Sequence, residues 1–346
     1  MKRIFVFVAV SMFAIGGLLA EEKVLIDFSK LITDLDQDQE GQVPQNRQTL
    51  MDFSRNAGTN YTPEQKAVMR TSLAIPNWIV ELASSSQTVT NEQLSYTKIS
   101  ASKEYGSVMG VRIHFPVASY NSWALIKPPF DIPAYEFTNV SEDGAIAPMD
   151  DYNFNTTQSR FEDGYGVIKN VGAIKSLQVS VYGLNFPHSL SAVFVDGNGK
   201  AQTVFLGYLN FDGWADLRWD NPQYVKEVRV RSMRIFPLYP AYAPYIRFAG
   251  FIIQRDGAND GGDFVTYFKD VEVIYDKAQL DQARDIDDES EWKVIGEREA
   301  DRQKREFKEF GKDQVFRFLE QQKMAPETEF NIRENQGGDQ GAAVAD

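Results

Sequence analysis

The feature that most constrains the fold of this chain is a run of short alternating segments between Trp78 and Tyr275. In "KSLQVSV", Leu177, Val179 and Val181 alternate with polar residues, which places them on one face of an extended strand. Such runs recur about every ten to fifteen residues without a helical pattern between them. The spacing predicts a mainly β protein whose antiparallel sheets form a sandwich or jelly roll.

Individual segments within this run are read in the same way. "EVRVRS" alternates Val228 and Val230 with arginines, which predicts a strand with one face in the core. "AVFVDGNGKAQTVFLG" has the turn residues DGNG between two apolar runs, which predicts a hairpin. "RFAGFIIQRD" and "FVTYFKDVEVIYD" are read as two further strands.

Helices are expected only at the periphery. "TPEQKAVMRTSLA" offers Thr62 as an N-cap, Pro63 at the first helical position and Gln65 to close a capping box. After about Lys277 charged residues become denser and the apolar spacing becomes helical. The apolar positions of this second pattern are Phe307, Phe310, Val315, Phe318 and Leu319. Gly311 is expected to interrupt the helix.

The first 20 residues have the three parts of a secretory signal. Lys2 and Arg3 precede an apolar run that ends at about Ile15, and small residues lead to an expected cleavage site after Ala20. Leu18 departs from the small-x-small rule for such sites. The sequence predicts export and no membrane association after cleavage; an uncleaved anchor helix is the alternative.

These boundaries divide the chain into four parts. Residues 1–20 are the expected signal peptide, and residues 21–276 are the β-sandwich domain. Residues 277–329 form a charged helical extension, and residues 330–346 lack the apolar content to pack, so a disordered tail is expected.

The charge and the cysteine content exclude several classes of function. The formal net charge of −13 would become −15 after loss of Lys2 and Arg3, and such an acidic chain is not expected to bind nucleic acid. Basic surfaces and cations are the partners that an acidic surface suits. The chain has no cysteine, so disulfides, thiolate metal ligands and thiol nucleophiles are absent, and packing must supply its stability.

The sequence offers no catalytic constellation, and the chain is expected not to be an enzyme. Its only histidines, His114 in "VRIHF" and His188 in "NFPHSL", are read as hydrogen-bonded structural residues, because a metal site would need tertiary folding to bring both together. A Gly-x-Ser-x-Gly elbow is missing, and the glycine-rich segments lack the lysine of a phosphate loop.

One loop has the residue types of a cation site. In "QRDGANDGGDF", hard oxygen ligands are available from Asp256, Asn259, Asp260 and Asp263. The glutamate that an EF-hand places at the twelfth position is missing. A structural cation and a plain acidic turn therefore remain the alternatives, and no other cofactor is expected.

Aromatic residues gather in two segments that also contain turn residues. These segments are "FLGYLNFDGWADLRWDNPQY" and "FPLYPAYAPYIRF", and the prolines of the second disfavour a regular central strand. The candidate contact residues are Phe211, Trp214, Trp219, Tyr239, Tyr242 and Tyr245. Core packing, contact with a partner protein and stacking on a sugar are the three uses left open.

The first aromatic segment allows a prediction of which side chains are buried. Leu206, Tyr208 and Leu217 have the context of strand residues and are expected to be buried. Trp214 follows Gly213 in the turn-like "DGW", so we expect it at a turn near one end of the sandwich and partly accessible.

Several long phrases are more distinctive than any of these motifs. They are "GVIKNVGAIKSLQVSVYGLNFPHSLSAVFVDGNGK", "LGYLNFDGWADLRWDNPQYV", "RIFPLYPAYAPYIRFAGFIIQRD" and "GGDFVTYFKDVEVIYD". Together with "SWALIKPPFDIPAYEF" and the early "VLIDFS", they resemble the flagellar filament outer-layer (sheath) proteins of spirochaetes, over roughly Val24 to Tyr275.

The resemblance implies a periplasmic, non-enzymatic subunit that coats a core filament of flagellin and contributes to motility. The partners that it implies are core flagellin subunits and other sheath proteins, and self-association is expected. The family is similar to galactose-binding-like β-sandwiches, which agrees with the strand pattern. A periplasmic carbohydrate-binding module that uses Phe211, Trp214 and Trp219 is therefore the alternative function.

Overall fold

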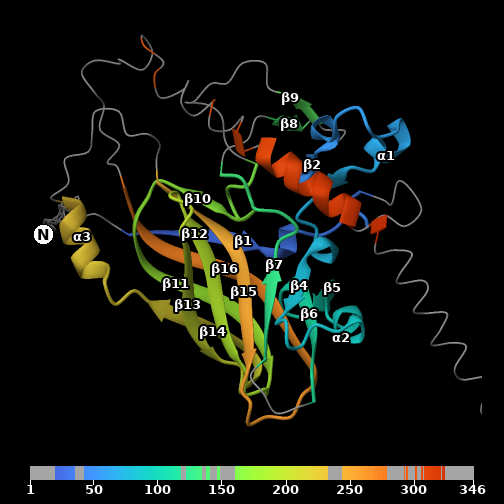
Figure 1. Cartoon of the computed structure of the whole chain (residues 1–346). Coiled ribbons are helices and arrows are strands. Elements are labelled where there is room, and N and C mark those ends of the chain that lie inside the picture. Colours follow the sequence, from blue (N-terminus) through green and yellow to red (C-terminus); the bar gives the residue numbers. More distant parts are fainter. Residues whose placement is uncertain are drawn as a thin grey trace, which may run out of the picture.

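Two antiparallel sheets of six strands each form the body of the molecule (Figure 1). The computed structural model describes residues 20–35, 43–117, 122–134, 138–140, 146–148, 160–232, 244–278 and 308–320, and single positions at 292, 294, 301, 305, 306, 322 and 323. Residues 1–19 of the expected signal peptide and the whole of the expected tail lie outside this part of the chain.

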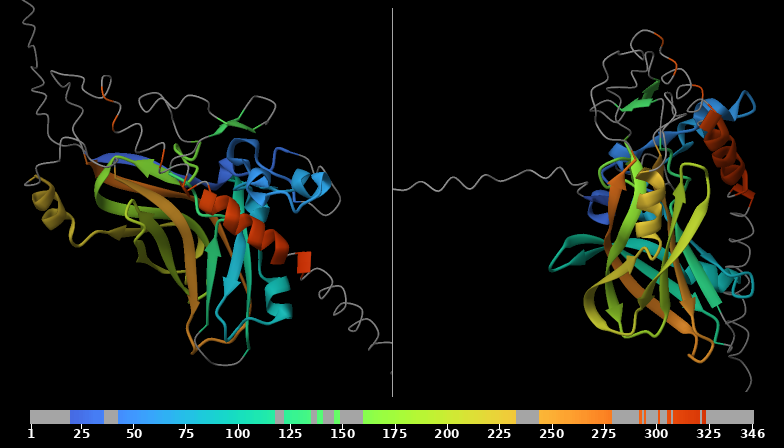
Figure 2. Two further views of the ribbon diagram at one scale, coloured as in Figure 1. Left: turned by 45° about the horizontal axis from the view of Figure 1, so that its top comes forward. Right: turned by 90° about the vertical axis from the view of Figure 1, so that its left-hand side faces the viewer.

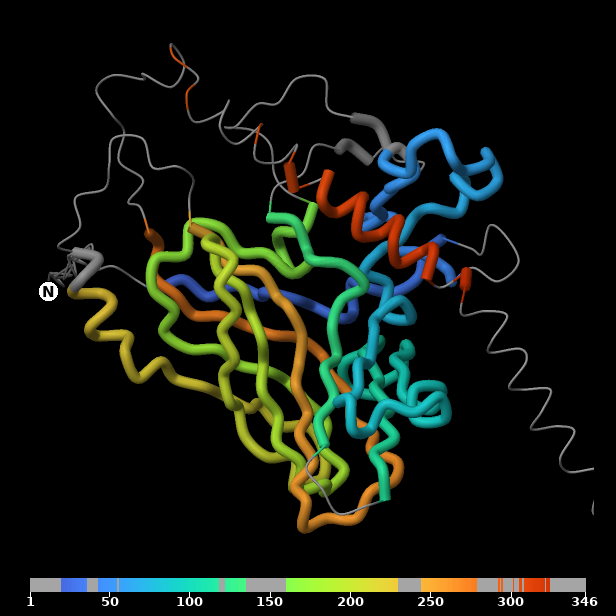
Figure 3. Tube along the Cα trace, viewed as in Figure 1, coloured from blue at the N-terminus to red at the C-terminus, as the bar shows by residue number. Residues whose placement is uncertain are grey.

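The first sheet, which we call sheet I, is organised around its longest strand. Its strands are, in order, β14 (Asp212–Asp220), β11 (Val171–Leu184), β16 (Gly262–Lys277), β6 (Gly106–Phe115) and β5 (Tyr96–Ser102), and β1 (Glu21–Asp27) also pairs with β16. One edge of β16 pairs with β11, and the other pairs with both β6 and β1. Figure 3 shows the early strand β1, in blue, beside the late strand β16, in orange.

The second sheet, sheet II, faces the first. Its strands are, in order, β13 (Ala201–Tyr208), β12 (Ser189–Asp196), β15 (Tyr245–Arg255), β7 (Ser122–Lys127) and β4 (Ile79–Leu82), and β10 (Val167–Lys169) also pairs with β15. Between β11 and β16 the chain passes repeatedly from one sheet to the other, as in a jelly roll. This arrangement confirms the antiparallel β-sandwich that the alternating segments predict.

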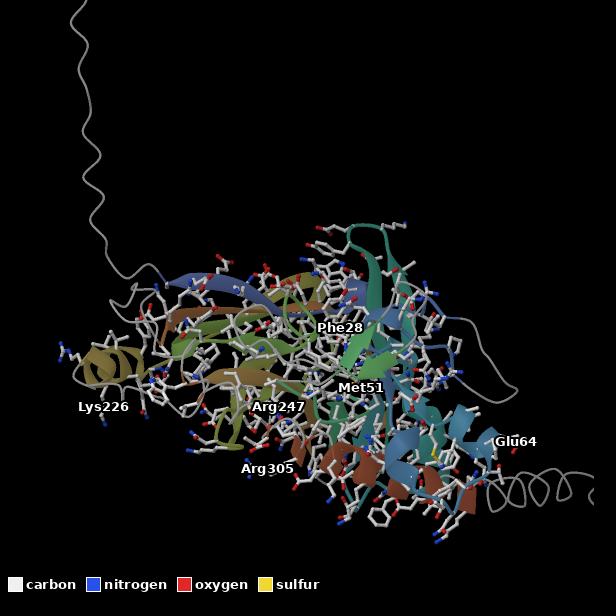
Figure 4. The ribbon with its side chains drawn as sticks, turned by 90° about the horizontal axis from the view of Figure 1, so that it is seen from above. Phe28, Met51, Glu64, Lys226, Arg247 and Arg305 are labelled. Carbon is white, nitrogen blue, oxygen red and sulfur yellow. The ribbon has the colours of Figure 1, made fainter. Side chains whose placement is uncertain are left out.

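Shorter elements lie around the sandwich. The helices are α1 (Pro63–Ala67), α2 (Val89–Leu94), α3 (Tyr224–Ser232) and the 3₁₀ turns η1 (Phe28–Lys30), η2 (Arg47–Thr49), η3 (Ser54–Ala57) and η4 (Ile75–Asn77). Two short strand pairs are β2 (Met51–Asp52) with β3 (Arg70–Thr71), and β8 (Thr138–Val140) with β9 (Ile146–Pro148). Seen from above in Figure 4, α1 with Glu64 and α3 with Lys226 lie at opposite ends. Within the described part of the chain, every helix is too short or too polar to cross a membrane.

Aromatic rings fill the space between the two sheets. Phe251 of sheet II stacks on Phe268 of sheet I, with ring centroids 4.2 Å apart and ring planes 9° from parallel. Phe248 and Phe28 pack against Phe251 at 4.9 and 6.2 Å, and Figure 4 shows Phe28 in the interior. Since the chain has no cysteine, this burial must supply the cohesion that disulfides give to many exported domains.

The helix predicted from "TPEQKAVMRTSLA" is confirmed as α1. Thr62 Oγ1 accepts a hydrogen bond from the amide of Gln65, and Gln65 Oε1 accepts one from the amide of Thr62, which is the predicted capping box. The helix is short, however, and ends at Ala67, because the chain then enters the strand β3.

Helix α3 stands where "EVRVRS" predicts a strand, so that prediction is wrong. Asn221 precedes the helix and donates a hydrogen bond of 3.0 Å to Glu227, which ties the preceding loop to the first turn. The Tyr224 hydroxyl donates to Asp276 of β16 at 3.0 Å and fixes the start of the helix on sheet I. An alternation of only two valines does not outweigh these contacts.

The helical segment 308–320 continues through Gly311, so the predicted interruption is also wrong. A side chain at Gly311 would overlap the side chain of Asn56, and glycine therefore permits a close approach between the helix and the sandwich. Phe310 packs edge-on against Phe130 with ring centroids 5.5 Å apart. The partly buried members of the predicted apolar stripe are Phe310, Val315, Phe318 and Leu319, and Phe307 lies outside the described residues.

We expect Phe251→Ala to lower the free energy of unfolding by about 3–5 kcal/mol, because it removes a fully buried ring from the contact between the sheets. Phe205→Ala is the matched control: its ring is exposed on sheet II, and the loss should stay within about 0.5 kcal/mol. Chemical denaturation of residues 21–346 measures both losses. Similar losses in the two variants would contradict this assignment of the core.

Candidate functional site

Trp214 lies inside a strand and not at a turn, so this part of the prediction is wrong. It is the third residue of β14 and pairs with Tyr182 of β11. Gly213 has a φ of 104°, which glycine tolerates, yet its pairing with Gly183 continues the strand. Trp214 is nevertheless partly exposed, because it belongs to the outward-facing set of β14 residues.

Four aromatic side chains form a row across the outer face of sheet I. Trp214 makes edge-to-face contacts with Tyr105 and Tyr182, with ring centroids 4.9 and 5.4 Å apart. Tyr182 makes a similar contact with Tyr267 at 5.9 Å. Gly110 of β6 makes room for this row, because a side chain there would come within 3.2 Å of the Tyr267 ring. We call Tyr105, Trp214, Tyr182 and Tyr267 the ring row; the sequence indicated only Trp214.

The side chain of Lys269 lies against Tyr105, at one end of the ring row. Its ammonium lies 4.9 Å from the centroid of the Tyr105 ring, a cation–π contact, and 2.6 Å from Oδ2 of Asp270. Oδ1 of Asp270 is buried and has no hydrogen-bond partner. A hydrogen bond with Glu104 raises the pKa of the Tyr105 phenol above its ordinary value.

Glu272 and three carboxylates that act on it form a set that we call the acidic group. They come from β1, β14 and β16, and they are Glu22, Asp216, Asp270 and Glu272. Burial raises the pKa of Glu272 above its ordinary value, and the negative charges of the other three raise it further. Lys269 acts in the opposite direction. The face therefore carries more negative charge than its nearby cation neutralises.

The other predicted contact residues lie elsewhere in the fold. Phe211 and Trp219 are partly buried against the core. Tyr245 is buried at the start of β15, where it pairs with Lys169 of β10. Trp219 and Tyr245 line one cavity of about 880 Å³, whereas Trp214 is not among its lining residues. Tyr239 and Tyr242 fall outside the described residues.

The outer face of sheet II carries exposed rings, one of which, Tyr208, the sequence places in the core. Phe205 and Tyr208 are 52% and 56% exposed, with ring centroids 5.4 Å apart. The predicted burial of Tyr208 is therefore wrong, whereas Leu206 is buried as expected and Leu217 is partly buried. A bulge explains the difference: β12 pairs with Phe205 and then with Gly207, so the alternation shifts by one residue before Tyr208.

The middle of this outer face has no charged side chain among the described residues. Register and burial place Val193 of β12, Ile252 of β15 and the exposed Trp123 of β7 on the same side as Phe205. Charges lie at its margins, where Arg247 and the ion pair of Lys127 with Glu81 are found. We call the surface of Phe205, Tyr208, Val193, Ile252 and Trp123 the uncharged face.

The loop with the predicted cation ligands is held as a turn. Oδ1 of Asp256 accepts a hydrogen bond of 3.0 Å from the amide two residues later, and its carbonyl accepts one of 3.1 Å from the amide of Asn259. Asp260 is exposed to solvent. No group of three acidic or histidine side chains in the described part of the chain could hold a metal ion.

Asp263 is engaged on β16 instead. It forms an ion pair of 2.8 Å with Arg112 and lies 2.8 Å from Nδ1 of His114, both on the neighbouring strand β6. The hydrogen bonds from Arg112 and then His114 lower the pKa of the Asp263 carboxyl. Asp263 is therefore already engaged by two side chains of β6, whereas Asp256 stabilises its own turn.

The two histidines point to different sides of sheet I. His114 is on the outer face beside Asp263. His188 is 4% exposed and packs on the core side, with its ring 5.4 Å from Phe115 and 5.0 Å from Phe264. Nδ1 of His188 is buried without a hydrogen-bond partner.

Fold and surface together define a class: a two-sheet β-sandwich with two extended outer faces of different chemistry. The model of the family described as "Flagellar filament outer layer protein Flaa" matches residues 42–284. The "Flagellar filament outer layer protein" of Treponema pallidum (strain Nichols) is 44% identical over 95% of this chain and 96% of its own length. The protein of the same name from Spirochaeta aurantia is 45% identical over 96% of each. The chain therefore belongs to the flagellar filament outer layer protein family.

More distant matches add little. A "Flagellar filament outer layer protein" of Borreliella burgdorferi is 35% identical over 64% of this chain and 61% of its own length. Among solved structures, a carbohydrate-binding module of the β-sandwich superfamily has a TM-score of 0.30 at 8% identity, with 58% of each chain covered. Likeness at that TM-score is too low to assign a ligand to this chain.

His188 should make the protein less stable in mild acid. Burial first, and then the positive charge of Arg255, lower its pKa from 6.5 to about 4. Between these values the unfolded chain binds a proton that the folded chain does not, so the free energy of unfolding falls as the pH drops through this window. His188→Gln should make that fall shallower, as measured by denaturation between about pH 7 and about pH 4.

His114→Gln is the matched control for this measurement. It removes the other histidine of the chain, which lies on the outer face of sheet I, and should leave the steep acid dependence in place. If His188→Gln keeps the wild-type slope, the buried histidine does not cause the acid dependence.

Proposed function

We propose that this chain is an outer-layer (sheath) subunit of a periplasmic flagellar filament, where it covers a core of flagellin and contributes to motility. The observation that carries the proposal is its 44% and 45% identity to two flagellar filament outer layer proteins over 95% and 96% of the chain. The secretory pattern of residues 1–20 supports the periplasmic location, since such a segment directs export.

The physical chemistry of the fold supports a structural role. The contact between Phe251 and Phe268 gives the sandwich an aromatic core without disulfides, and both outer sheet faces offer area for contacts. A standard interface buries about 800 Å² on each partner, which one face of a six-stranded sheet can supply. The proposal assigns no catalytic residue and no cofactor to the chain, and neither nucleic acid nor membrane is among its partners.

The carbohydrate-binding alternative has one favourable observation. Trp219 lines the cavity of about 880 Å³ with polar neighbours such as Asn221 and Gln223, and many ligand pockets are of this size. The three rings first assigned to a sugar platform do not come together, however, because Trp214 lies in the ring row and Phe211 packs against Gly183. The sheath role therefore remains the leading proposal.

The same proposal includes self-association, in which a second copy of the chain binds to the uncharged face. Two copies that each carry a net charge of −13 repel one another wherever acidic surfaces meet. The uncharged face is the surface where this repulsion is weakest, and its exposed Phe205 and Tyr208 provide apolar area to bury.

The sheath role predicts that the protein copurifies with flagella. Immunogold electron microscopy of isolated filaments should label their surface along the length, because an outer-layer subunit lies outside the core. A periplasmic protein unrelated to motility is the control and should be lost during purification. The sheath role is wrong if the protein is lost to the same degree.

The double substitution Phe205→Glu with Tyr208→Glu should weaken self-association at least tenfold, because it adds two like charges to each partner in the uncharged face. Sedimentation velocity of residues 21–346 over a range of concentrations measures the effect. Val225→Glu, which puts one such charge on an exposed apolar residue of α3, is the control and should leave association unchanged. Equal weakening in both variants would point to net charge and not to this face.

A further inference from the structure

The ring row places large aromatic side chains where the stability of the sandwich does not need them. Tyr105 is 36% exposed, and Trp214, Tyr182 and Tyr267 are partly exposed on the outer face of sheet I. Their edge-to-face contacts hold each ring against the next. A partner would meet rings that are already in place, which lowers the entropy cost of ordering side chains on binding.

Negative charge surrounds these rings. Lys269 is the cation that acts on Glu272, Arg218 on the same face of β14 is paired with Asp220, and Glu104 adds a further carboxylate beside Tyr105. Asp216 is close enough to act on both Tyr105 and Glu272, so the carboxylates and the rings form one continuous surface. Positive charge from a partner would relieve the repulsion among these carboxylates.

Asp270 independently indicates that a hydrogen-bond donor is missing from this surface. It is 5% exposed; one of its oxygens pairs with Lys269, and the other is buried without a hydrogen bond. A buried carboxylate oxygen in this state has lost its water and gained no donor, which costs free energy. A donor that arrives with a partner would remove this cost.

Lys269 shows which chemical group this surface accepts. Its ammonium meets the Tyr105 ring and a carboxylate oxygen of Asp270 together. Rings and carboxylates in this combination recognise cationic side chains, because the ring face and the carboxylate are both negative in potential. The same combination continues from Tyr105 toward Trp214 and Asp216, where no described cation is yet bound to the rings.

We propose that the ring row and the acidic group together bind a protein segment that carries exposed lysine or arginine side chains. The inference rests on the proposed function, because the segment would belong to another component of the filament. A cationic side chain of the partner lies against Trp214 and Tyr182 and pairs with Asp216. Further donors from the same segment reach Asp270.

Two other occupants fit this surface less well. A neutral sugar brings no positive charge to offset the carboxylates of the acidic group. A metal ion needs ligands that converge, and among the described residues no three carboxylates do so. A basic segment can instead bridge carboxylates that lie apart.

The test is cosedimentation of residues 21–346 with flagellar filaments from which the outer layer has been stripped. Glu104→Lys combined with Asp216→Lys should weaken binding at least tenfold, and Tyr105→Ala should weaken it about threefold. All three side chains are exposed, so the variants should fold. Glu309→Lys combined with Glu320→Lys makes the same change of net charge on the helical segment 308–320 and should bind like wild type.

A deca-arginine peptide, measured by fluorescence anisotropy, tests the face without filaments. Wild type should bind it, and Glu104→Lys with Asp216→Lys should bind at least tenfold more weakly than the control pair. Equal weakening by both pairs would overturn the inference, because net charge alone would then explain binding. Displacement of the peptide by a neutral oligosaccharide such as β-1,4-galactotriose would overturn it in favour of a sugar site.

The two arms separate the failure of the inference from the failure of the proposed function. If wild type does not sediment with stripped filaments, the sheath role fails, and the peptide arm still decides what the face binds. If wild type and Glu104→Lys with Asp216→Lys sediment equally, the sheath role stands and the basic partner on this face is excluded.

Discussion

The stacked pair of Phe251 and Phe268 is the contact on which the rest of the molecule depends. It joins sheet II to sheet I across the core, and β16, which carries Phe268, also pairs with β11, β6 and β1. The strand after the expected signal cleavage site is therefore fixed in the sheet that the stacked pair holds in place. A chain without cysteine can keep its strands together in this way, because long-range pairing and burial replace covalent links.

The sandwich was predictable wherever local and tertiary preferences agree. Leu177, Val179 and Val181 alternate in sequence and are all buried, and the capping box of Thr62 and Gln65 forms as expected. The failures come from contacts between residues far apart in sequence. Helix α3 is anchored by Tyr224 on Asp276, and Gly311 is needed for contact with Asn56; a local pattern contains neither fact.

The candidate site shows the same division. Trp214 could be found from sequence as a large ring beside turn residues, but Tyr182 and Tyr267 join it only through the pairing of β14, β11 and β16, and Tyr105 reaches it from the turn between β5 and β6. Tyr208 was misplaced because one bulge in β13 reverses the side to which it points. Strand register, which sequence alternation does not determine, therefore decides which rings act together.

The two outer faces differ in a way that suits a subunit with two kinds of neighbour. Apolar residues occupy the middle of sheet II, whereas carboxylates and rings occupy sheet I. If both faces were apolar, copies of the protein could stack through either face. The assembly could then grow without a defined number of subunits. Negative charge on sheet I opposes contact with a second acidic copy and leaves that face for a partner of opposite charge. The separation of charge between the sheets thus suits the two proposed contacts, with a second copy on sheet II and a partner of opposite charge on sheet I.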